Sequence, residues 1–272
     1  MAKIIAITGA NKGLGKAIIE KIIQEAPEFD VVLMTSRNTE RGFRTKGELE
    51  MKYGKQSRLH YQQLDVTSLE SIRNFAEFVQ KTYGHIDVFV NNAAIYSKTG
   101  QFTIDIVQST LDSNFYGLVN VTEVILPLMR ENGHIINVSS RMGSTQCIPD
   151  PEIAERFLSD YLTREELFRL AHDFLEGTRA GNWVARGWPT QAYSVSKVLV
   201  NGYTRVLDRE LRDRRIKVKV NSVCPGHLRT DMGGPSAPFS VDEGTITPMI
   251  MIKYTGEESG RFWYNGGVQE WA

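Results

Sequence analysis

The chain has 272 residues, which is enough for one large α/β domain with a substantial buried core. Its 32 basic residues balance 32 acidic ones, which excludes a strong overall attraction to nucleic acid or to an anionic membrane. The two cysteines, Cys147 and Cys224, are too few for a disulfide framework and lack metal-ligand spacing. The amino-terminal apolar run is too short for a signal peptide, and no segment approaches about 20 uninterrupted apolar residues. We expect a cytosolic protein without a metal site.

The first half of the chain alternates between short apolar runs and helical patterns. Runs typical of strands lie at 3–8, 30–37, 58–66, 85–93 and 133–140. Helical patterns follow the first four of them at 15–26, 38–54, 68–84 and 105–129. Strands separated by helices at such regular intervals predict right-handed βαβ units and a parallel sheet covered on both faces.

The alternation stops after Ser140 and resumes near residue 191. The segment from about 147 to 188 is charged and strand-free, and it contains two amphipathic helical patterns. A helix at 191–213, a strand at 216–226 and a short strand at 261–267 follow. We predict a single doubly wound Rossmann domain over residues 1–272, with a mostly parallel sheet and a helical insertion at about 147–188.

A glycine-rich turn, TGANKGLG, joins the first strand to the first helix. Gly9, Gly13 and Gly15 allow a tight turn and the close approach of a pyrophosphate, while the helix offers free N–H groups and its positive dipole end. A purely structural turn is the alternative, but the position at the first strand of a doubly wound sheet favours dinucleotide binding.

Two cations near this turn indicate which dinucleotide binds. The second strand ends at Arg37 without the acidic residue that usually binds the ribose hydroxyls of NAD, and Lys12 stands inside the turn. A guanidinium can hold the 2′-phosphate of NADP, which a carboxylate would repel. We therefore predict NADP(H), with two solvated surface cations as the alternative.

A later stretch, QAYSVSK, places Tyr193 and Lys197 one helical turn apart. That spacing arises easily by chance, so the stretch is ambiguous alone. Other motifs precede and follow it in a fixed order: the glycine turn, NNA at 91–93, NVSS at 137–140 and CPG at 224–226. Together they resemble the short-chain dehydrogenase/reductase family over essentially the whole chain. The insertion, GWPTQAYSVSK, CPGHLRTDM and the late EWA resemble its monomeric cytosolic carbonyl reductases.

The resemblance implies both a catalytic set and cofactor contacts. The catalytic tetrad would be Asn114, Ser140, Tyr193 and Lys197, with Ser139 supporting the turn. With the glycine turn and its cations, the expected cofactor contacts are Gly9, Asn11, Lys12, Gly13, Leu14, Gly15, Arg37, Asp65, Val66, Asn91, Ala93, Tyr193, Lys197, Pro225, Gly226 and Thr230. Among these, the resemblance implies that Asp65 and Val66 lie near the adenine and Asn91 beside a ribose.

Each residue of the tetrad suits the reduction of a carbonyl. A nicotinamide supplies hydride but no proton, and the Tyr193 hydroxyl can donate the proton. Its ordinary pKa of about 10 is high for neutral pH, and the nearby ammonium of Lys197 should lower it. Ser140 can hydrogen-bond the substrate oxygen. In the family, Asn114 helps a water connect Lys197 to solvent. Taken singly, each residue could instead have a purely structural role: a capping serine, a surface asparagine and a core tyrosine.

The insertion and the neighbours of the tetrad lead to further expectations. Because oligomeric family members pair through the helices that bear Asn114 and Tyr193, an extra helical pair there should produce a monomer; the alternative is a peripheral insertion.

We predict a substrate pocket formed by Ser140, Met142, Trp188 and His227. His227 stands where mammalian relatives of the subfamily carry tryptophan, which puts their substrate range in doubt. Cys224 is either a buried inert thiol or a reactive one.

The predicted function is NADPH-dependent reduction of ketones, aldehydes and quinones to alcohols by hydride transfer. The nearest alternative is a hydroxysteroid or prostaglandin dehydrogenase/reductase. A non-catalytic NADP-binding regulator is a minor alternative, since such proteins commonly lose a tetrad residue and all four are present here. The expected partner is a small carbonyl compound rather than nucleic acid or membrane.

Overall fold

A computed structural model describes residues 2–55 and 58–271 of the chain. Its strands form a single eight-stranded sheet in the order β3-β2-β1-β4-β5-β6-β7-β8. The strands are β1 (Ile4–Ile7), β2 (Val31–Ser36), β3 (Leu59–Gln63), β4 (Ile86–Asn91), β5 (Met129–Val138), β6 (Lys219–Cys224), β7 (Phe262–Tyr264) and β8 (Gly267–Gln269). Every neighbouring pair is parallel except β7 and β8. The predicted doubly wound, mostly parallel sheet is confirmed.

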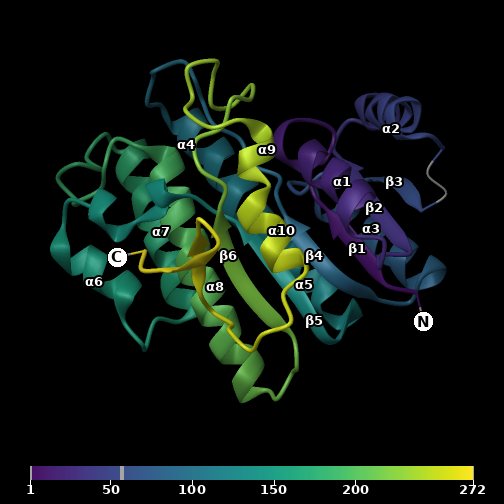
Figure 1. Ribbon diagram of the computed structural model, residues 1–272. Coiled ribbons are helices and arrows are strands. Elements are labelled where there is room, and N and C mark those ends of the chain that lie inside the picture. Colours follow the sequence, from purple (N-terminus) through teal and green to yellow (C-terminus); the bar gives the residue numbers. More distant parts are fainter. Residues whose placement is uncertain (1, 56–57, 272) are drawn as a thin grey trace.

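Helices cover both faces of this sheet (Figure 1). The longer ones are α1 (Gly13–Glu25), α2 (Thr39–Tyr53), α3 (Leu69–Thr82), α4 (Ile104–Leu111), α5 (Gly117–Ile125), α6 (Pro151–Leu158), α7 (Arg164–Arg179) and α8 (Ala192–Asp213). Alternate residues of a strand point to opposite faces. On β1, Ala6 therefore joins the core under α3, α5 and α8, whereas Ile5 and Ile7 join the core under α1.

The chain between β4 and β5 departs from the single helix expected at 105–129. One turn of π-helix at Asp112–Tyr116 separates α4 from α5, and a 3-10 turn at Leu126–Leu128 contains Pro127. Two short helices near the carboxyl end, α9 (Val241–Gly244) and α10 (Ile246–Ile252), were not predicted, and neither was β8. α10 lies against β5 and α1, where Met249 and Met251 complete the core on that face.

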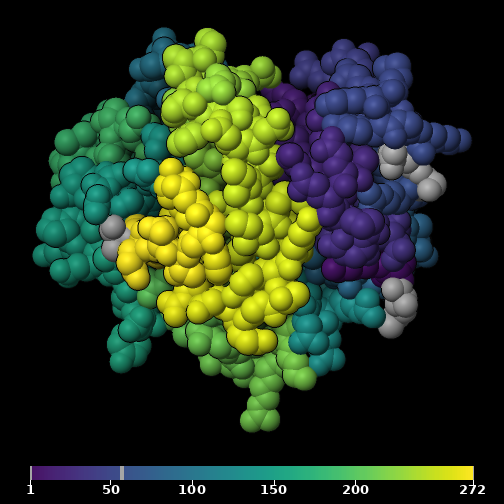
Figure 2. Space-filling model, viewed as in Figure 1, coloured from purple at the N-terminus to yellow at the C-terminus, as the bar shows by residue number. Residues whose placement is uncertain are grey.

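The segment between β5 and α8 carries α6 and α7 to the end of the sheet opposite α2 (Figure 1). α7 packs against α4 and α8, and α6 packs against α8. The carboxyl-terminal segment lies across one face between these helices and the amino-terminal half (Figure 2). There Trp271 is buried, and its carbonyl accepts the N–H of Thr145 at 3.1 Å. Within the described ranges, none of the helices is both long and apolar enough to span a membrane.

Candidate active site

Three of the four predicted catalytic side chains meet where β5 ends against α8. Tyr193 and Lys197 lie one turn apart near the start of α8. The Lys197 side chain is only 2% exposed, and its Nζ donates to the carbonyl oxygen of Val138 at 2.8 Å, 5.6 Å from the centre of the Tyr193 ring. Ser140 lies two residues after the end of β5, and a hydrogen bond from it to Tyr193 lowers the pKa of that phenol.

Burial controls the protonation of both groups on α8. Burial raises the pKa of Tyr193 above its ordinary value, the neighbouring Cys224 adds to this electrostatically, and the hydrogen bond from Ser140 only partly opposes it. Burial lowers the pKa of Lys197 to about 8. The expected lowering of the Tyr193 pKa by Lys197 is therefore wrong for the protein alone. The phenol is held in its protonated form at neutral pH.

The fourth predicted catalytic residue, Asn114, lies in the π-helical turn and is almost completely buried. Its Oδ1 accepts the N–H of Ile95 at 2.8 Å, and its Nδ2 donates to the carbonyl of Ile95 at 3.0 Å. The same Nδ2 donates to Ser196 Oγ in α8 at 3.1 Å. Asn114 thus connects the chain after β4 to the helix that bears Tyr193 and Lys197.

A 3-10 turn at Arg141–Gly143 follows Ser140 and is held from two sides. Cys224, at the end of β6, accepts the N–H of Arg141 at 3.2 Å through its Sγ. Asn201 in α8 donates to the carbonyl of Gly143 at 3.0 Å. Cys224 is 3% exposed and burial raises its pKa, which favours the buried, inert thiol.

The glycine turn adopts the conformation that its sequence requires. Gly9 has φ +63° and Gly13 has φ +53°, both in the left-handed region where glycine is favoured. α1 begins at Gly13 and has no acidic residue in its first turn, and none of the described side chains caps it. Its first N–H groups are therefore free to bind an anion.

The loop after β4 packs directly against this turn. Thr8 Oγ1 accepts the N–H groups of Asn92 and Ala93, each at 2.9 Å, and Asn92 Nδ2 donates to the carbonyl of Thr8 at 2.8 Å. Sequence reasoning assigned no role to Thr8 or Asn92. A hydroxyl at the end of a strand that is followed by a glycine turn was the available signal.

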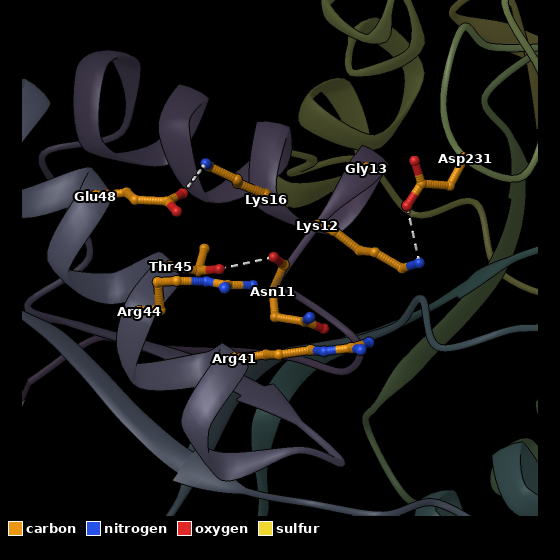
Figure 3. A pocket seen from close by; sticks show the side chains of 9 residues that line it. All are labelled: Asn11, Lys12, Gly13, Lys16, Arg41, Arg44, Thr45, Glu48 and Asp231. Carbon is orange, nitrogen blue, oxygen red and sulfur yellow. Dashed lines mark hydrogen bonds and ion pairs between the residues drawn. The ribbon is translucent and has the colours of Figure 1, made fainter.

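A hollow lined by basic residues opens beside the turn (Figure 3). Asn11, Lys12 and Gly13 line it together with Lys16 of α1 and Arg41 and Arg44 of α2. Lys12 forms an ion pair with Asp231 at 3.0 Å, and Lys16 forms one with Glu48 at 2.7 Å. The free helix N-terminus and these cations fit a dinucleotide phosphate.

Arg41 and Arg44 were missed by sequence reasoning, which had selected Arg37. Arg37 directly follows β2 and has no acidic neighbour there, as predicted, but it does not line this hollow. The missed signal was the pair of arginines three residues apart near the start of α2, which share one helical face.

Other expected cofactor contacts lie at the carboxyl edge of the sheet. Asp65 follows β3, and its Oδ1 accepts two hydrogen bonds from Thr67. Val66 is buried beside Gly117. The expected role of Asn91 is corrected for its side chain, which is buried and donates to Thr122 at 3.0 Å and Asn137 at 2.9 Å, inside the protein.

The segment after β6 closes the other side of the glycine turn. Gly226 has φ +89°, and Pro225 precedes it. Thr230 lies beside Gly13, since its methyl carbon would be 3.6 Å from a Cβ placed there. The expected cofactor contacts after β6 therefore stand next to the glycine turn expected to bind the pyrophosphate.

The predicted substrate walls divide into exposed and buried residues. Met142, two residues after Ser140, is 44% exposed, and His227 is exposed, with Nε2 3.0 Å from the carbonyl oxygen of Gly233. Trp188 is corrected: it is 1% exposed, packs against Phe157 and Phe174, and donates from Nε1 to Asp173 at 2.7 Å. Its side chain anchors the helices of the 147–188 segment instead of facing a pocket.

Comparison with known proteins defines the class to which this site belongs. The family model for short chain dehydrogenase matches residues 3–149 and 184–239, and the chain belongs to that family. Carbonyl reductase [NADPH] 1 of Sus scrofa is 38% identical, with 99% of this chain and 94% of the relative covered. The Homo sapiens protein of the same name is 37% identical, with 97% of each chain covered. The predicted resemblance to carbonyl reductases is confirmed.

Solved structures agree with this assignment. Salutaridine reductase from Papaver somniferum has a TM-score of 0.86 at 26% identity, covering 97% of this chain and 99% of its own. An NADPH-bound carbonyl reductase from chicken fatty liver has a TM-score of 0.73 at 22% identity, covering 99% of each chain, and shows the shared fold. The family match omits residues 150–183, where α6 and α7 lie.

Proposed function

We propose that the protein reduces ketones, aldehydes and quinones to alcohols with NADPH, and that Tyr193 is the proton donor. The observation that carries the proposal is the contact of Tyr193 with Ser140 and with the buried Lys197 at the carboxyl edge of the sheet. The curated relatives named carbonyl reductase [NADPH] support this substrate class and this cofactor.

Bound NADPH would supply the hydride that attacks the carbonyl carbon. The Ser140 hydroxyl is placed to donate a hydrogen bond to the carbonyl oxygen and to fix its position. Tyr193 gives its proton to the same oxygen as negative charge develops there, so the carbonyl gains one hydride and one proton. Burial keeps that proton on the phenol beforehand. Lys197, with a pKa of about 8, is largely charged at neutral pH and stabilises the phenolate left behind.

The phosphates of NADPH would lie at the start of α1 and in the basic hollow beside it. The N–H groups of the first turn can hold the pyrophosphate. Lys12, Arg41 and Arg44 offer positive charge for a 2′-phosphate, and Arg37 remains a proposed contact at the end of β2. Lys12 would have to exchange its exposed ion pair with Asp231 for the phosphate, at small cost, since such pairs contribute little.

We also propose that residues 1–272 act as one domain and as a monomer. Leu167 of α7 lies 2.8 Å from the position of a Cβ on Gly202 of α8, and Arg164 is paired with Glu123 of α5 at 2.7 Å. The segment 147–188 therefore covers the helices that bear or follow the catalytic residues. Burial of those faces within one chain supports a monomer.

The test is a panel of carbonyl compounds assayed with NADPH and NADH in parallel, followed by the absorbance of the reduced nicotinamide. We expect turnover with NADPH preferred. Tyr193→Phe removes the proton donor and should lower kcat/KM by about 100-fold or more. Tyr161→Phe, at a 90% exposed position, is the matched control and should match the wild type. Cofactor binding without turnover would favour a regulator, and a preference for NADH would contradict the role of the basic hollow.

A further inference from the structure

We propose that Tyr96 selects substrates whose carbonyl is attached to an aromatic or conjugated ring, an inference that rests on the proposed function. Tyr96 belongs to the loop between β4 and α4. Its ring meets that of Tyr193 at a centroid distance of 5.4 Å and an interplanar angle of 87°, an edge-to-face pair. Tyr96 is thus a second aromatic ring in contact with the group that would donate the proton.

Much of Tyr96 remains available to a ligand. It is 40% exposed, whereas large aromatic residues inside the domain, such as Phe115 and Phe174, are fully buried. Its contact with Tyr193 covers only part of the ring. An aromatic side chain that is half exposed beside a catalytic group offers a surface for apolar, planar ligands.

The main chain next to Tyr96 is fixed relative to Tyr193. Asn114 binds both the N–H and the carbonyl of Ile95, and it also donates to Ser196 Oγ. Ser196 in turn donates to the carbonyl of Tyr193 at 2.7 Å. The loop that carries Tyr96 and the helix that carries Tyr193 are therefore held by the same buried asparagine. The main chain before Tyr96 is thus held against α8, and the Tyr96 ring rests against Tyr193.

The reaction brings the substrate to this ring. A carbonyl oxygen that accepts the Tyr193 proton must come within hydrogen-bond distance of its hydroxyl, so the groups attached to the carbonyl lie close to Tyr96. A planar π-system can pair with the exposed part of the ring, which a saturated ring of equal size does less well. Such pairs are worth about a 2- to 10-fold preference. Because the contact exists before and during the reaction, it should lower KM and leave kcat little changed.

The experiment compares two ketones that differ only in aromaticity, acetophenone and cyclohexyl methyl ketone. We expect Tyr96→Ala to lower the ratio of kcat/KM for the aryl over the saturated ketone by about 2- to 10-fold, mainly through KM. Tyr96→Phe keeps the ring and should keep the ratio. Tyr161→Ala, at an exposed tyrosine in the 147–188 segment, is the matched control.

Several outcomes separate this inference from the proposed function. Equal loss on both ketones in Tyr96→Ala would mean that Tyr96 only supports Tyr193, and an unchanged ratio would mean that the ring does not meet the substrate; either overturns the inference. Calorimetric dissociation constants of the two ketones, measured with NADP⁺ present, should change in the same ratio and require no turnover. A wild-type protein that binds with this preference but reduces neither ketone would refute the proposed function alone.

Discussion

Tyr193 and Lys197 show how burial decides the charge of individual residues in this site. Sequence spacing brings the ammonium near the phenol, and Coulomb attraction alone would lower the pKa of Tyr193. In the folded chain the loss of water dominates, so the pKa of the phenol rises and that of the amine falls to about 8. In the reduction proposed above, this arrangement would provide a proton donor that is protonated at the start and a charged amine beside it.

Gly143 is a second residue whose role follows from distances alone. A Cβ at this position would lie 2.7 Å from the main-chain carbonyl carbon of Lys197 and 2.8 Å from its Cβ. Gly143→Ala should therefore push the turn after Ser140 away from α8 and displace the Ser140 hydroxyl. We expect kcat to fall by about 10- to 100-fold, since a shift of about 1 Å can cost that much.

Gly47→Ala is the matched control for Gly143→Ala, because a Cβ there meets nothing within 4 Å and the residue lies in α2. It should keep full activity and gain a little stability from the better helix former. Steady-state kinetics on both variants, with thermal unfolding to confirm folding, provide the measurement. Normal activity in Gly143→Ala would show that the turn tolerates a methyl group and that Ser140 is positioned by other contacts.

Several residue roles could not be predicted from sequence because they depend on the direction of a side chain. Trp188 stands five residues before Tyr193, yet its indole points into the core toward Asp173. Asn91 occupies a family motif, yet its amide is used inside the sheet. Arg41 and Tyr96 reach the site only because of how α2 crosses the glycine turn and how the loop after β4 bends. Motif order predicted Ser140, Tyr193 and Lys197 because chain topology already brings them to one edge.

At the scale of elements, a π-helical turn between α4 and α5 places Asn114 in the site. The apolar pattern at 105–129 predicted a continuous helix, and the π-helical turn within it directs Asn114 toward Ile95 and Ser196. A π-turn adds one residue to a helical turn and is frequent at functional sites. The amphipathic pattern gives no sign of it. Only the asparagine, a poor helix former, marked the position.

His134 joins three elements and makes the stability of the protein depend on pH. It lies on β5, its Nδ1 is 3.1 Å from the carbonyl oxygen of Met251 in α10, and its Nε2 accepts from Asn221 in β6 at 3.0 Å. These partners require a neutral ring with the proton on Nδ1. Burial, assisted by the positive charge of Lys219, lowers the pKa of His134 to about 3.

The pKa of His134 is lower in the folded protein than in the unfolded chain, which makes the protein less stable in acid. Below about pH 6.5 His134 binds a proton in the unfolded chain, whereas in the folded protein it stays neutral until about pH 3. Because the unfolded state binds more protons over this range, the free energy of unfolding falls as the pH falls. This single group should contribute a loss of about 2 kcal/mol between pH 7 and pH 5. Urea unfolding at the two pH values measures it.

His134→Gln removes the titrating ring and should show a smaller loss of stability over the same pH interval, whatever its stability at pH 7. His172→Gln, at an exposed position in α7, is the matched control and should keep the slope of the wild type. Equal slopes in the wild type and in His134→Gln would refute the account. The difference between variants removes the contribution of the carboxyl groups, which also titrate in this range.

At the scale of the whole molecule, regular alternation of strands and helices was sufficient to predict the sheet, because buried parallel strands must be continuous apolar runs. It also predicted a short strand at 261–267, where β7 lies, but it did not predict β8, α9 or α10. β7 is only three residues long and pairs with β8 through a hairpin, and α9 and α10 are short. Elements this short carry too few residues to show a period.

The covering of α8 by α6 and α7 leads to a prediction about the assembly. Phe157 and Leu167 from the 147–188 segment both approach Gly202, and Phe168 stacks on Tyr116 with ring centres 5.7 Å apart. An isologous dimer through α5 and α8 would need these same faces. We expect sedimentation velocity at micromolar concentration to give one species of about 31 kDa, the mass of a single chain of 30.7 kDa.

A variant that disrupts the packing of α7 on α8 tests whether this packing keeps the protein monomeric. Leu167→Asp places a charge against α8 where Leu167 is fully buried, so it should detach α7, lower the melting temperature and expose an apolar face that self-associates. Leu158→Asp, at a 36% exposed leucine of α6, is the matched control and should remain monomeric. A stable dimer of the wild type would contradict the monomer directly. If Leu167→Asp stays monomeric and fully stable, the packing of α7 on α8 is not what prevents self-association through α5 and α8.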